Sequence, residues 1–584
     1  MASTNPPIMD IKTADDDSKI SAAHLERMKT VNTTQPDNLE LSIWQTIKQN
    51  PVIVLCCIYS NMGALMYGFD NIALSLCLNM VPFQMQFGVL VDGAYLIPAY
   101  WQSLWNAMAQ ICTGFGAWGA GPISDRFGRR ISFLVSGLIS VAGTAVIYTA
   151  TTPGAFLGGK MVNALGLGMA LTTGQIYVSE ITPLKIRGVA LSAYAFSMNL
   201  GYLIAASVAF DRVAIMDQSS YKVLFASNWV WPLVILLFCF VVPESPYHLV
   251  RKGDLSSASK ALSKLYNQST SVEPILASMV QITREESFQA SASSETSYME
   301  LFKGTNWRRT RIILYINGIN QMIGATFIAN APYFMISAGL SPSQSSMMVE
   351  LGIGFALISS FFTFWFMTFI GRRKMILSGI SLAIVLFLIM GIAASVSSSK
   401  ASLWCVGITL QLVWFTIGPS IGPSISLAGE ISSLRLRAKS QSLGFFFNYS
   451  YSTVWNVVVP YMFNKSEGNL GGKMGWIFFA TSCITFFVVW AEVPETKDRT
   501  YEELDEMFSE GVEARKFKSH TTTKRAADAK ISSIDPARIR LMALKYSTIL
   551  YKRTLLCLNL LNPYIYRLSD IEVYFEFQCH IFLQ

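Results

Sequence analysis

Charged residues are scarce in this chain. They make up 14% of its 584 residues, whereas an ordinary soluble domain carries about 25%. Hydrophobic residues make up 52%, and the mean hydropathy is +0.39. Because so little charge cannot cover a soluble globule of this length with polar surface, the composition indicates a membrane protein that crosses the bilayer several times.

Signals of other protein classes are missing as well. The sequence has no Cys-x-x-Cys pair, no His-x-x-x-His pair and no Walker motif, so we expect no metal or other cofactor, no use of ATP and no enzymatic activity. The basic residues form short clusters between apolar runs rather than one patch, which argues against a nucleic-acid partner. The polar N-terminus lacks the apolar core of a cleavable signal peptide, so the first apolar run is expected to direct insertion.

Twelve segments are apolar over about 20 residues, the length at which a helix spans a bilayer. Six of them precede a polar stretch at 244–309, and six follow it. Within that stretch, "SSASKALSKLY" places Ala258, Ala261, Leu262 and Leu265 on one face of a short amphipathic helix. The twelve segments begin near Pro51, Trp101, Ile131, Ala155, Val189, Val223, Thr310, Ser345, Met375, Ala401, Gln441 and Gly475.

The sequence therefore predicts an all-α integral membrane protein with about 12 transmembrane helices in two pseudo-symmetric six-helix bundles. The predicted parts are an N-terminal tail (1–50), a first bundle (51–243), a central loop with short helices (244–309), a second bundle (310–494) and a C-terminal tail (495–584) that becomes atypical after about residue 526.

The distribution of Lys and Arg predicts the orientation. One set of alternate short loops holds eleven of these residues and the other set holds five. Since loops rich in Lys and Arg stay in the cytosol, both termini and the central loop are expected there. The sequon at Asn464 then lies outside and is a candidate glycosylation site.

The two halves of the sequence repeat each other. "SEITPLKIRG" aligns with "GEISSLRLRA", "PES" with "PET", and "FGRR" with "IGRR", at offsets of 250, 251 and 243 residues. Three ordered matches at nearly one offset indicate a duplicated six-helix unit. Internal repeats of this kind are typical of secondary transporters, whose substrate sites lie between the halves near the middle of the membrane.

The motifs themselves resemble those of a known family. "GAGPISDRFGRR" (119–130), directly after the second span, resembles the signature of the major facilitator superfamily. "PESPYHLVRKGD", "GEISSLRLRAK" and "PETKDRTYEEL" resemble signatures of its sugar-porter family, and "AGEISSLRLRAKSQSLGFFFNYS" looks most like the fungal maltose and general α-glucoside permeases. The resemblance covers roughly residues 51–508 and implies alternating access to a central site.

The charged residues of these motifs are candidates for a cytosolic gate. In sugar porters the matching residues form networks that hold the halves together when the site faces outward, and the resemblance implies such a latch here. The position equivalent to Asp125 in the second half is Thr368, so the latch is expected to be asymmetric. The alternative is topogenic charge in solvated pairs worth about 0–1 kcal/mol each. The gate residues are Asp125, Arg129, Glu180, Arg187, Glu244, Arg372, Glu430, Arg437 and Glu495.

Asp70, in "ALMYGFDNIAL", is a carboxylate inside an apolar run. Ionisable groups are costly at membrane depth and indicate function. Proton-coupled sugar porters carry an acid here and an Arg on the fourth span, where this chain has Lys160. The resemblance implies that Asp70 carries the coupling proton, that Lys160 pairs with the ionised acid, and that protonation releases the pair. The alternative is that Asp70 only caps or pairs structurally, while Lys160 extends to an interface.

The seventh span holds candidate sugar contacts. Sugars need directional hydrogen bonds and apolar stacking surface, and the resemblance places Asn320, Gln321 and Thr326 at the family's polar contact positions. On an ideal helix Asn320 and Thr326 lie about 240° apart, so a common face requires a break in the helix, which Gly324 allows. The alternative is that these amides only bond neighbouring helices.

Other family contacts do not carry over to this chain. Ala195 and Tyr202 stand where the fifth span usually has Gln, and Ile417 stands where hexose and xylose porters often have a stacking Trp. Tyr202 and Asn448, with Trp455 beyond, remain as candidate contacts. These departures argue against a plain hexose porter.

The sequence thus predicts a monomeric, proton-coupled importer of a sugar, in particular an α-glucoside such as maltose, in the plasma membrane. Its partners are the sugar, protons and the lipid bilayer. Three alternatives stay open: a transporter of a non-sugar fungal metabolite, a facilitative sugar uniporter, and a nutrient sensor that does not transport.

Overall fold

The computed structural model is almost entirely helical. Its described residues up to Lys518 form one compact unit. It describes residues 43–91, 94–266, 272–293, 298–332, 335, 341–396, 400–432, 436–464, 467–497, 499 and 501–522.

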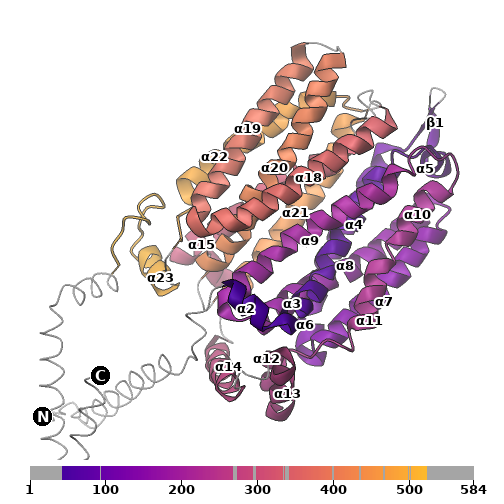
Figure 1. Cartoon of the computed structure of the whole chain (residues 1–584). Coiled ribbons are helices and arrows are strands. Elements are labelled where there is room, and N and C mark those ends of the chain that lie inside the picture. Colours follow the sequence, from indigo (N-terminus) through magenta and orange to yellow (C-terminus); the bar gives the residue numbers. More distant parts are fainter. Residues whose placement is uncertain are drawn as a thin grey trace, which may run out of the picture. The chain divides into compact units, whose positions relative to one another are not determined.

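The first half of this unit is a bundle of long helices, drawn in purple in Figure 1. Two of its spans consist of consecutive shorter helices: α3 runs directly into α4, and α10 into α11. The elements are α2 (Ile43–Gln49), α3 (Pro51–Ser60), α4 (Met62–Cys77), α5 (Val81–Phe87), β1 (Val89–Val91), β2 (Ala94–Leu96), α6 (Ala99–Phe127), α7 (Arg129–Thr149), α8 (Pro153–Ile181), α9 (Leu184–Phe210), α10 (Ser219–Ser227) and α11 (Val230–Phe238).

The second half is a similar bundle that follows a set of short helices. Figure 1 shows α12, α13 and α14 at the opposite end of the first bundle from β1. These elements are α12 (Pro246–Arg251), α13 (Leu255–Leu265), α14 (Glu273–Ser293), η1 (Tyr298–Phe302), α15 (Gly304–Met322), α16 (Ala325–Ala329), α18 (Pro342–Phe369), α19 (Arg372–Val396), α20 (Lys400–Ile431), α21 (Arg437–Phe463), η2 (Gly471–Lys473), α22 (Met474–Glu492) and α23 (Tyr501–Ser509).

Ten helical segments of the described residues are long and apolar enough to cross a membrane. Two further helices, α6 with 29 residues and α21 with 27, are long enough to span but more polar. At 1.5 Å per residue both exceed the roughly 30 Å of the hydrocarbon core. Together these twelve segments make up the predicted all-α membrane fold with about 12 transmembrane helices.

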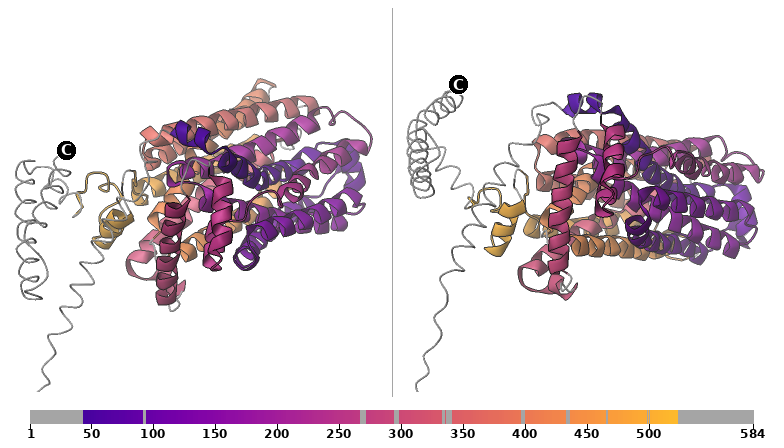
Figure 2. Two further views of the ribbon diagram at one scale, coloured as in Figure 1. Left: turned by 60° about the horizontal axis from the view of Figure 1, so that its bottom comes forward. Right: turned by 90° about the horizontal axis from the view of Figure 1, so that it is seen from below.

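The two halves meet through two pairs of helices. α6 packs against α21, and α9 packs against α18. The Ser103 hydroxyl donates to the Val457 carbonyl at 3.0 Å, and Asn199 Nδ2 donates to Ser360 Oγ at 2.9 Å. In both views of Figure 2 the helices of the first half lie beside those of the second half. The polar α6 and α21 are therefore central helices, whose amides face protein rather than lipid.

Close helix packing depends on glycine at two crossings. A Cβ atom at Gly68 would lie 2.0 Å from the Met198 carbonyl oxygen, and one at Gly168 would lie 2.0 Å from that of Thr113. Without side chains at these positions, α4 approaches α9 and α8 approaches α6. Small residues at such crossings are the usual means of helix association in membranes.

The short helix predicted in the central loop from its apolar spacing is confirmed. In α13, Ala258, Ala261, Leu262 and Leu265 are the buried residues. Asp254 caps its N-terminus through a bond from the Ser257 amide at 3.0 Å.

Some local features differ from the prediction. Most helices begin a few residues earlier than the apolar runs, as α15 does at Gly304 rather than Thr310, because a helix extends past the hydrocarbon into polar surroundings. The antiparallel hairpin of β1 and β2, in which Val89 pairs with Leu96, was not predicted. Its signal is the Asp-Gly dipeptide at 92–93, a strong hairpin turn between apolar residues.

Candidate functional site

A cavity of about 90 Å³ lies between the two bundles. Both halves contribute to its wall, the first through α4, α6, α8 and α9 and the second through α15, α16 and α21. The polar and charged side chains that line it are Tyr67, Asp70, Asn71, Asn106, Gln110, Thr113, Lys160, Tyr202, Asn320, Gln321, Thr326, Ser452 and Asn456.

Asp70 and Lys160 form an ion pair in this wall. Lys160 Nζ lies 2.6 Å from Asp70 Oδ2 and 3.4 Å from the Asp70 carbonyl oxygen. Both residues are buried, Asp70 with 4% and Lys160 with 3% of its surface exposed. Taking two charges out of water is costly, so the pair is stable only while both partners are present.

Two asparagines that the sequence did not single out complete the surroundings of Asp70. Asn163 of α8 donates to Asp70 Oδ1 at 2.9 Å, and Asn228, between α10 and α11, donates to the same oxygen at 3.4 Å. Asn163 is one turn beyond Lys160, so its place on the same helix face was a usable signal. No sequence signal points to Asn228, which lies 158 residues from Asp70.

The seventh span is broken where its sequence predicted a break. α15 ends at Met322 and α16 begins at Ala325, with Gly324 between them in the left-handed conformation at φ +83°. The break brings Asn320, Gln321 and Thr326 to the wall of one cavity. Thr326 Oγ1 donates to Gln321 Oε1 at 2.6 Å, which fixes the Gln321 amide with its NH₂ group as the available donor.

Of the other two predicted contacts, Tyr202 lies in the cavity wall and Asn448 does not. Tyr202 lines the cavity, and its ring packs against Trp414 with centroids 5.5 Å apart. Asn448 instead donates to the Asn317 carbonyl at 2.7 Å and is not among the residues that line the cavity. The Trp455 ring packs on Phe478 at 5.1 Å.

Asn448 was the residue of α21 predicted to contact the sugar. The residues of α21 that line the cavity are instead Ser452 and Asn456. They continue the line of Asn448 at intervals of four residues, and Asn106 and Gln110 form a similar pair on α6. Polar residues at i and i+4 mark one face of a helix. This spacing in the second and eleventh spans was the signal that could have identified them.

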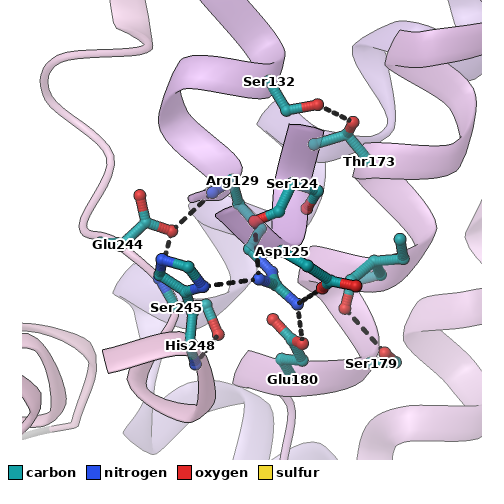
Figure 3. A network of polar contacts seen from close by, with 11 residues as sticks. Ser124, Asp125, Arg129, Ser132, Thr173, Ser179, Glu180, Glu244, Ser245 and His248 are labelled. Atoms are coloured by element: carbon teal, nitrogen blue, oxygen red, sulfur yellow. Dashed lines mark hydrogen bonds and ion pairs between the residues drawn. The ribbon is translucent and has the colours of Figure 1, made fainter. Parts of the chain in front are cut away.

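Among the described residues, the gate residues Asp125, Glu180 and Glu244 gather around Arg129, at the start of α7 (Figure 3). Its Nη2 atom lies 2.6 Å from Glu180 Oε1 and 3.3 Å from Asp125 Oδ1. Its Nη1 atom donates to the Ser124 carbonyl and to His248 Nδ1, both at 2.9 Å. Arg129 is 1% exposed, so these partners compensate a buried charge.

Glu244 completes this cluster from the segment after α11. Its carboxylate accepts from the backbone amide of Arg129 at 2.8 Å (Figure 3). It also accepts from the backbone amide of Arg130 at 3.2 Å. A carboxylate at a helix N-terminus is favourable because it meets unpaired amides and the positive end of the helix dipole. Gly128 makes room for it, since a Cβ there would lie 2.6 Å from Glu244 Oε2.

The second half repeats this arrangement. Arg372, at the start of α19, lies 3.1 Å from Glu430, which also accepts from the Thr496 hydroxyl. Glu495 corresponds to Glu244, and a Cβ at Gly371 would lie 2.0 Å from its Oε2 atom. These contacts join residues within one half, and a latch between the halves stays a prediction. The side chains of Arg187, Arg437 and Thr368 lie outside the described residues.

His248 contributes a titratable group to the Arg129 cluster. The pKa of its imidazole is lowered from the usual value, first by burial and then by the positive charge of Arg129. Since the Arg129 guanidinium can only donate, His248 Nδ1 accepts and the ring is neutral. The folded protein therefore binds fewer protons at this site than the unfolded chain as the pH falls below about 6.5.

Acidification is therefore expected to destabilise the protein through His248. This contribution to stability is complete above about pH 6.5 and is lost as the pH falls through the lowered pKa of the folded state. Between pH 7.5 and 5.5, the Tm of the purified protein should fall further than that of His248→Gln, whose amide accepts from Arg129 without titrating. His520→Gln is the control, and its Tm should fall as much as that of the wild type. An equal fall in Tm for the wild type and His248→Gln would contradict this role.

Asn464, the predicted glycosylation position, follows α21 and is 7% exposed. Its backbone carbonyl belongs to a turn, in which it accepts from the backbone amides of Glu467 at 3.1 Å and Asn469 at 3.0 Å. The rest of the sequon, 465–466, lies outside the described residues.

Comparisons with known proteins agree with this architecture. A family model described as "Sugar (and other) transporter" matches residues 56–508. The chain is 30% identical over 502 residues to the MFS transporter fmqE of Aspergillus fumigatus, and the match covers 83% of this chain and 92% of that protein. It is 26% identical over 514 residues to the general alpha-glucoside permease of Saccharomyces cerevisiae, and the match covers 87% of this chain and 83% of the permease.

Among solved structures, the fold is similar to that of the proton:xylose symporter XylE bound to 6-bromo-6-deoxy-D-glucose. The TM-score is 0.63 at 19% identity, and the match covers 78% of this chain and 99% of XylE.

Proposed function

The chain belongs to the sugar (and other) transporter family of the major facilitator superfamily, and we propose that it imports a sugar together with protons. The cargo we propose is an α-glucoside such as maltose, and the membrane is the plasma membrane, with both termini in the cytosol. The protein would work as a monomer, with the proton as its coupling ion and without ATP.

The observation that carries this proposal is the buried Asp70–Lys160 pair in the wall of the central cavity. It places a carboxylate that can hold a proton beside the amides that can bind a sugar. Charges inside a membrane protein are rare and mark ion or proton pathways. The similarity to the general alpha-glucoside permease supports the choice of cargo.

Protonation of Asp70 would remove the charge that holds Lys160. While Asp70 is ionised, the pair ties α4 to α8 at 2.6 Å. Once the acid is neutral, this tie is reduced to hydrogen bonds, and the helices of the first half can shift. A cavity of about 90 Å³ is smaller than the roughly 300 Å³ at which ligand pockets begin. Cargo entry therefore requires the two halves to move apart.

The sugar would be held by groups from both halves. Gln321, Asn320 and Asn456 offer amides that donate to and accept from hydroxyl groups. The ring of Tyr202, supported by Trp414, offers the apolar surface on which a pyranose face can pack. Because the two halves share the ligand, binding would favour their approach, as alternating access requires.

Uptake of labelled sugars in yeast without its own sugar transporters tests this proposal. The panel compares maltose, other α-glucosides, glucose and xylose at external pH 5 and pH 7. We expect uptake of an α-glucoside that is faster at pH 5 and raises the external pH. If no sugar enters at either pH, the cargo assignment is wrong.

Within that assay, Gln321→Ala is expected to raise the KM for the transported sugar about 3- to 10-fold, because one hydrogen bond of about 0.5–1.5 kcal/mol is lost. Asn448→Ala is the matched control, since its amide bonds the α15 backbone outside the cavity wall. Equal effects of the two substitutions would contradict the cavity as the sugar site.

A second candidate keeps the fold and changes the cargo to a small non-sugar metabolite. Ile417 in place of a stacking Trp favours it, as does the 30% identity to MFS transporter fmqE, a relative whose name does not specify a sugar. This candidate would be supported if no sugar were taken up while the infrared band of protonated Asp70 still appeared at acidic pH. Uptake with no movement of protons would instead support a uniporter, and glucose-dependent signalling without flux would support a sensor.

A further inference from the structure

The two carboxylate oxygens of Asp70 have different neighbours. Oδ2 faces the ammonium group of Lys160 at 2.6 Å, whereas Oδ1 faces the amides of Asn163 and Asn228. All three contacts are donated to Asp70. This arrangement suits an ionised carboxylate, which only accepts hydrogen bonds.

A neutral Asp70 needs an acceptor for its own hydroxyl group. Lys160 cannot provide one, because an ammonium group only donates. Asn163 is held in its present orientation, since Ser140 Oγ donates to Asn163 Oδ1 at 2.5 Å. Turning Asn163 would break that bond together with the one of 2.9 Å to Asp70, so it stays a donor.

Asn228 differs from Asn163 in having an unused acceptor. Its side chain is 1% exposed, and among the described residues its carbonyl oxygen Oδ1 has no hydrogen-bond partner. Its contact with Asp70, at 3.4 Å, is longer than a usual hydrogen bond. A half-turn of this amide therefore gives up little and brings Oδ1 toward Asp70.

We propose that Asn228 is the positioning residue for the coupling proton: its amide turns when Asp70 is protonated, and its carbonyl oxygen accepts the new Asp70 hydroxyl. This inference rests on the proposed proton coupling at Asp70. A proton from the cavity binds to Oδ1, no other bond is made or broken covalently, and the Asp70–Lys160 pair changes from net charge 0 to +1. Asn228 lies between α10 and α11, so its turn links protonation to the joint of the sixth span.

Few other groups that titrate lie near Asp70. Lys160 faces it from α8, and on α4 itself the Tyr67 phenol and the Cys77 thiol interact with it electrostatically. From α9, Tyr202 lines the same cavity, and from α10, Tyr221 lies beside Cys77. Tyr and Cys side chains are neutral at the pH of uptake, so among these groups Asp70 is the one that takes up the proton from the cavity.

Infrared difference spectra of the full-length protein in liposomes, recorded between acidic and alkaline pH, test this role. The C=O stretch of protonated Asp70 is identified as the band that disappears in Asp70→Asn. A carboxyl group whose hydroxyl donates a hydrogen bond absorbs at a lower wavenumber than a free one. We therefore expect this band to move to a higher wavenumber in Asn228→Leu and in the smaller Asn228→Ala.

Asn163→Leu is the matched control, because Asn163 contacts the same Asp70 oxygen, Oδ1, as Asn228 does. It removes a donor that does not change its orientation, so the band should stay at the wild-type position. An unmoved band in both Asn228 variants would overturn the inference and leave proton coupling intact. A spectrum of Asp70→Asn without a lost band would overturn both. A shifted band without sugar uptake would leave the inference standing and refute only the cargo.

Discussion

Replacing Lys160 with methionine is expected to lower the free energy of unfolding by about 3–5 kcal/mol, the usual cost of removing one partner of a buried ion pair. Asp70 is 4% exposed and would keep only the two asparagines as donors. Either an unpaired charge stays buried, or the acid takes up a proton and its buried hydroxyl group needs an acceptor. The measurement is thermal or denaturant unfolding of the purified protein in detergent.

The double variant Asp70→Asn with Lys160→Met separates loss of the pair from loss of packing. Because a neutral pair of similar volume often replaces a buried ion pair without loss, it should recover most of the stability lost in Lys160→Met. Lys264→Met, at an exposed position of α13, should leave stability within about 0.5 kcal/mol of the wild type. A double variant as unstable as Lys160→Met would show that Lys160 acts through its packing rather than its charge.

Asp70→Asn is expected to abolish uphill transport. With pH 7.5 inside liposomes and pH 5.5 outside, import of one proton with each sugar can accumulate sugar up to about 100-fold, since each pH unit is worth a factor of ten. Asparagine resembles neutral Asp70 in shape but carries no exchangeable proton. The accumulation ratio should therefore fall to about 1, while exchange of labelled for unlabelled sugar continues.

The comparison of accumulation with exchange makes this result specific. A variant that merely misfolds loses both, whereas loss of coupling alone spares exchange. Asp217→Asn, at an exposed acid before α10, should accumulate sugar like the wild type. Undiminished accumulation by Asp70→Asn would rule out Asp70 as the proton carrier.

The sequence predicted the central pair and the broken seventh span but only part of the cavity wall. Asp70 could be found because it is an isolated charge in an apolar run, and Lys160 because it stands where proton-coupled sugar porters carry an Arg. Gly324 could be found because the spacing of Asn320 and Thr326 required a break. Asn448 was chosen on α21, whereas the cavity is lined by Ser452 and Asn456 one and two turns further on. How deep a residue lies along a helix depends on packing against neighbours, which the helical period does not fix.

The partners of the charged motifs were also beyond the sequence. Arg129 was expected to act between the halves, but its contacts in the described structure are to Glu180, Glu244 and His248 of its own half. His248 lies within the motif "PESPYHLVRKGD", but nothing in the sequence paired it with Arg129, which is 119 residues away in the chain. Its burial results from the packing of α12 against α8, α13 and α14, beside the Arg129 side chain.

The sequence by itself determined the number of spans, the duplication and the family, because each has a local cause. A backbone in lipid must satisfy its own hydrogen bonds, so apolar runs of sufficient length become helices whatever their neighbours. Motifs repeated at one offset give the duplication without coordinates. Only the tertiary structure decided which polar groups meet. Asp70, Asn163 and Asn228 come from three spans, and the packing of these spans brings both asparagine amides within 3.4 Å of Asp70 Oδ1. Hydrogen bonds act over about 3 Å, so their partners are set by packing rather than by position in the sequence.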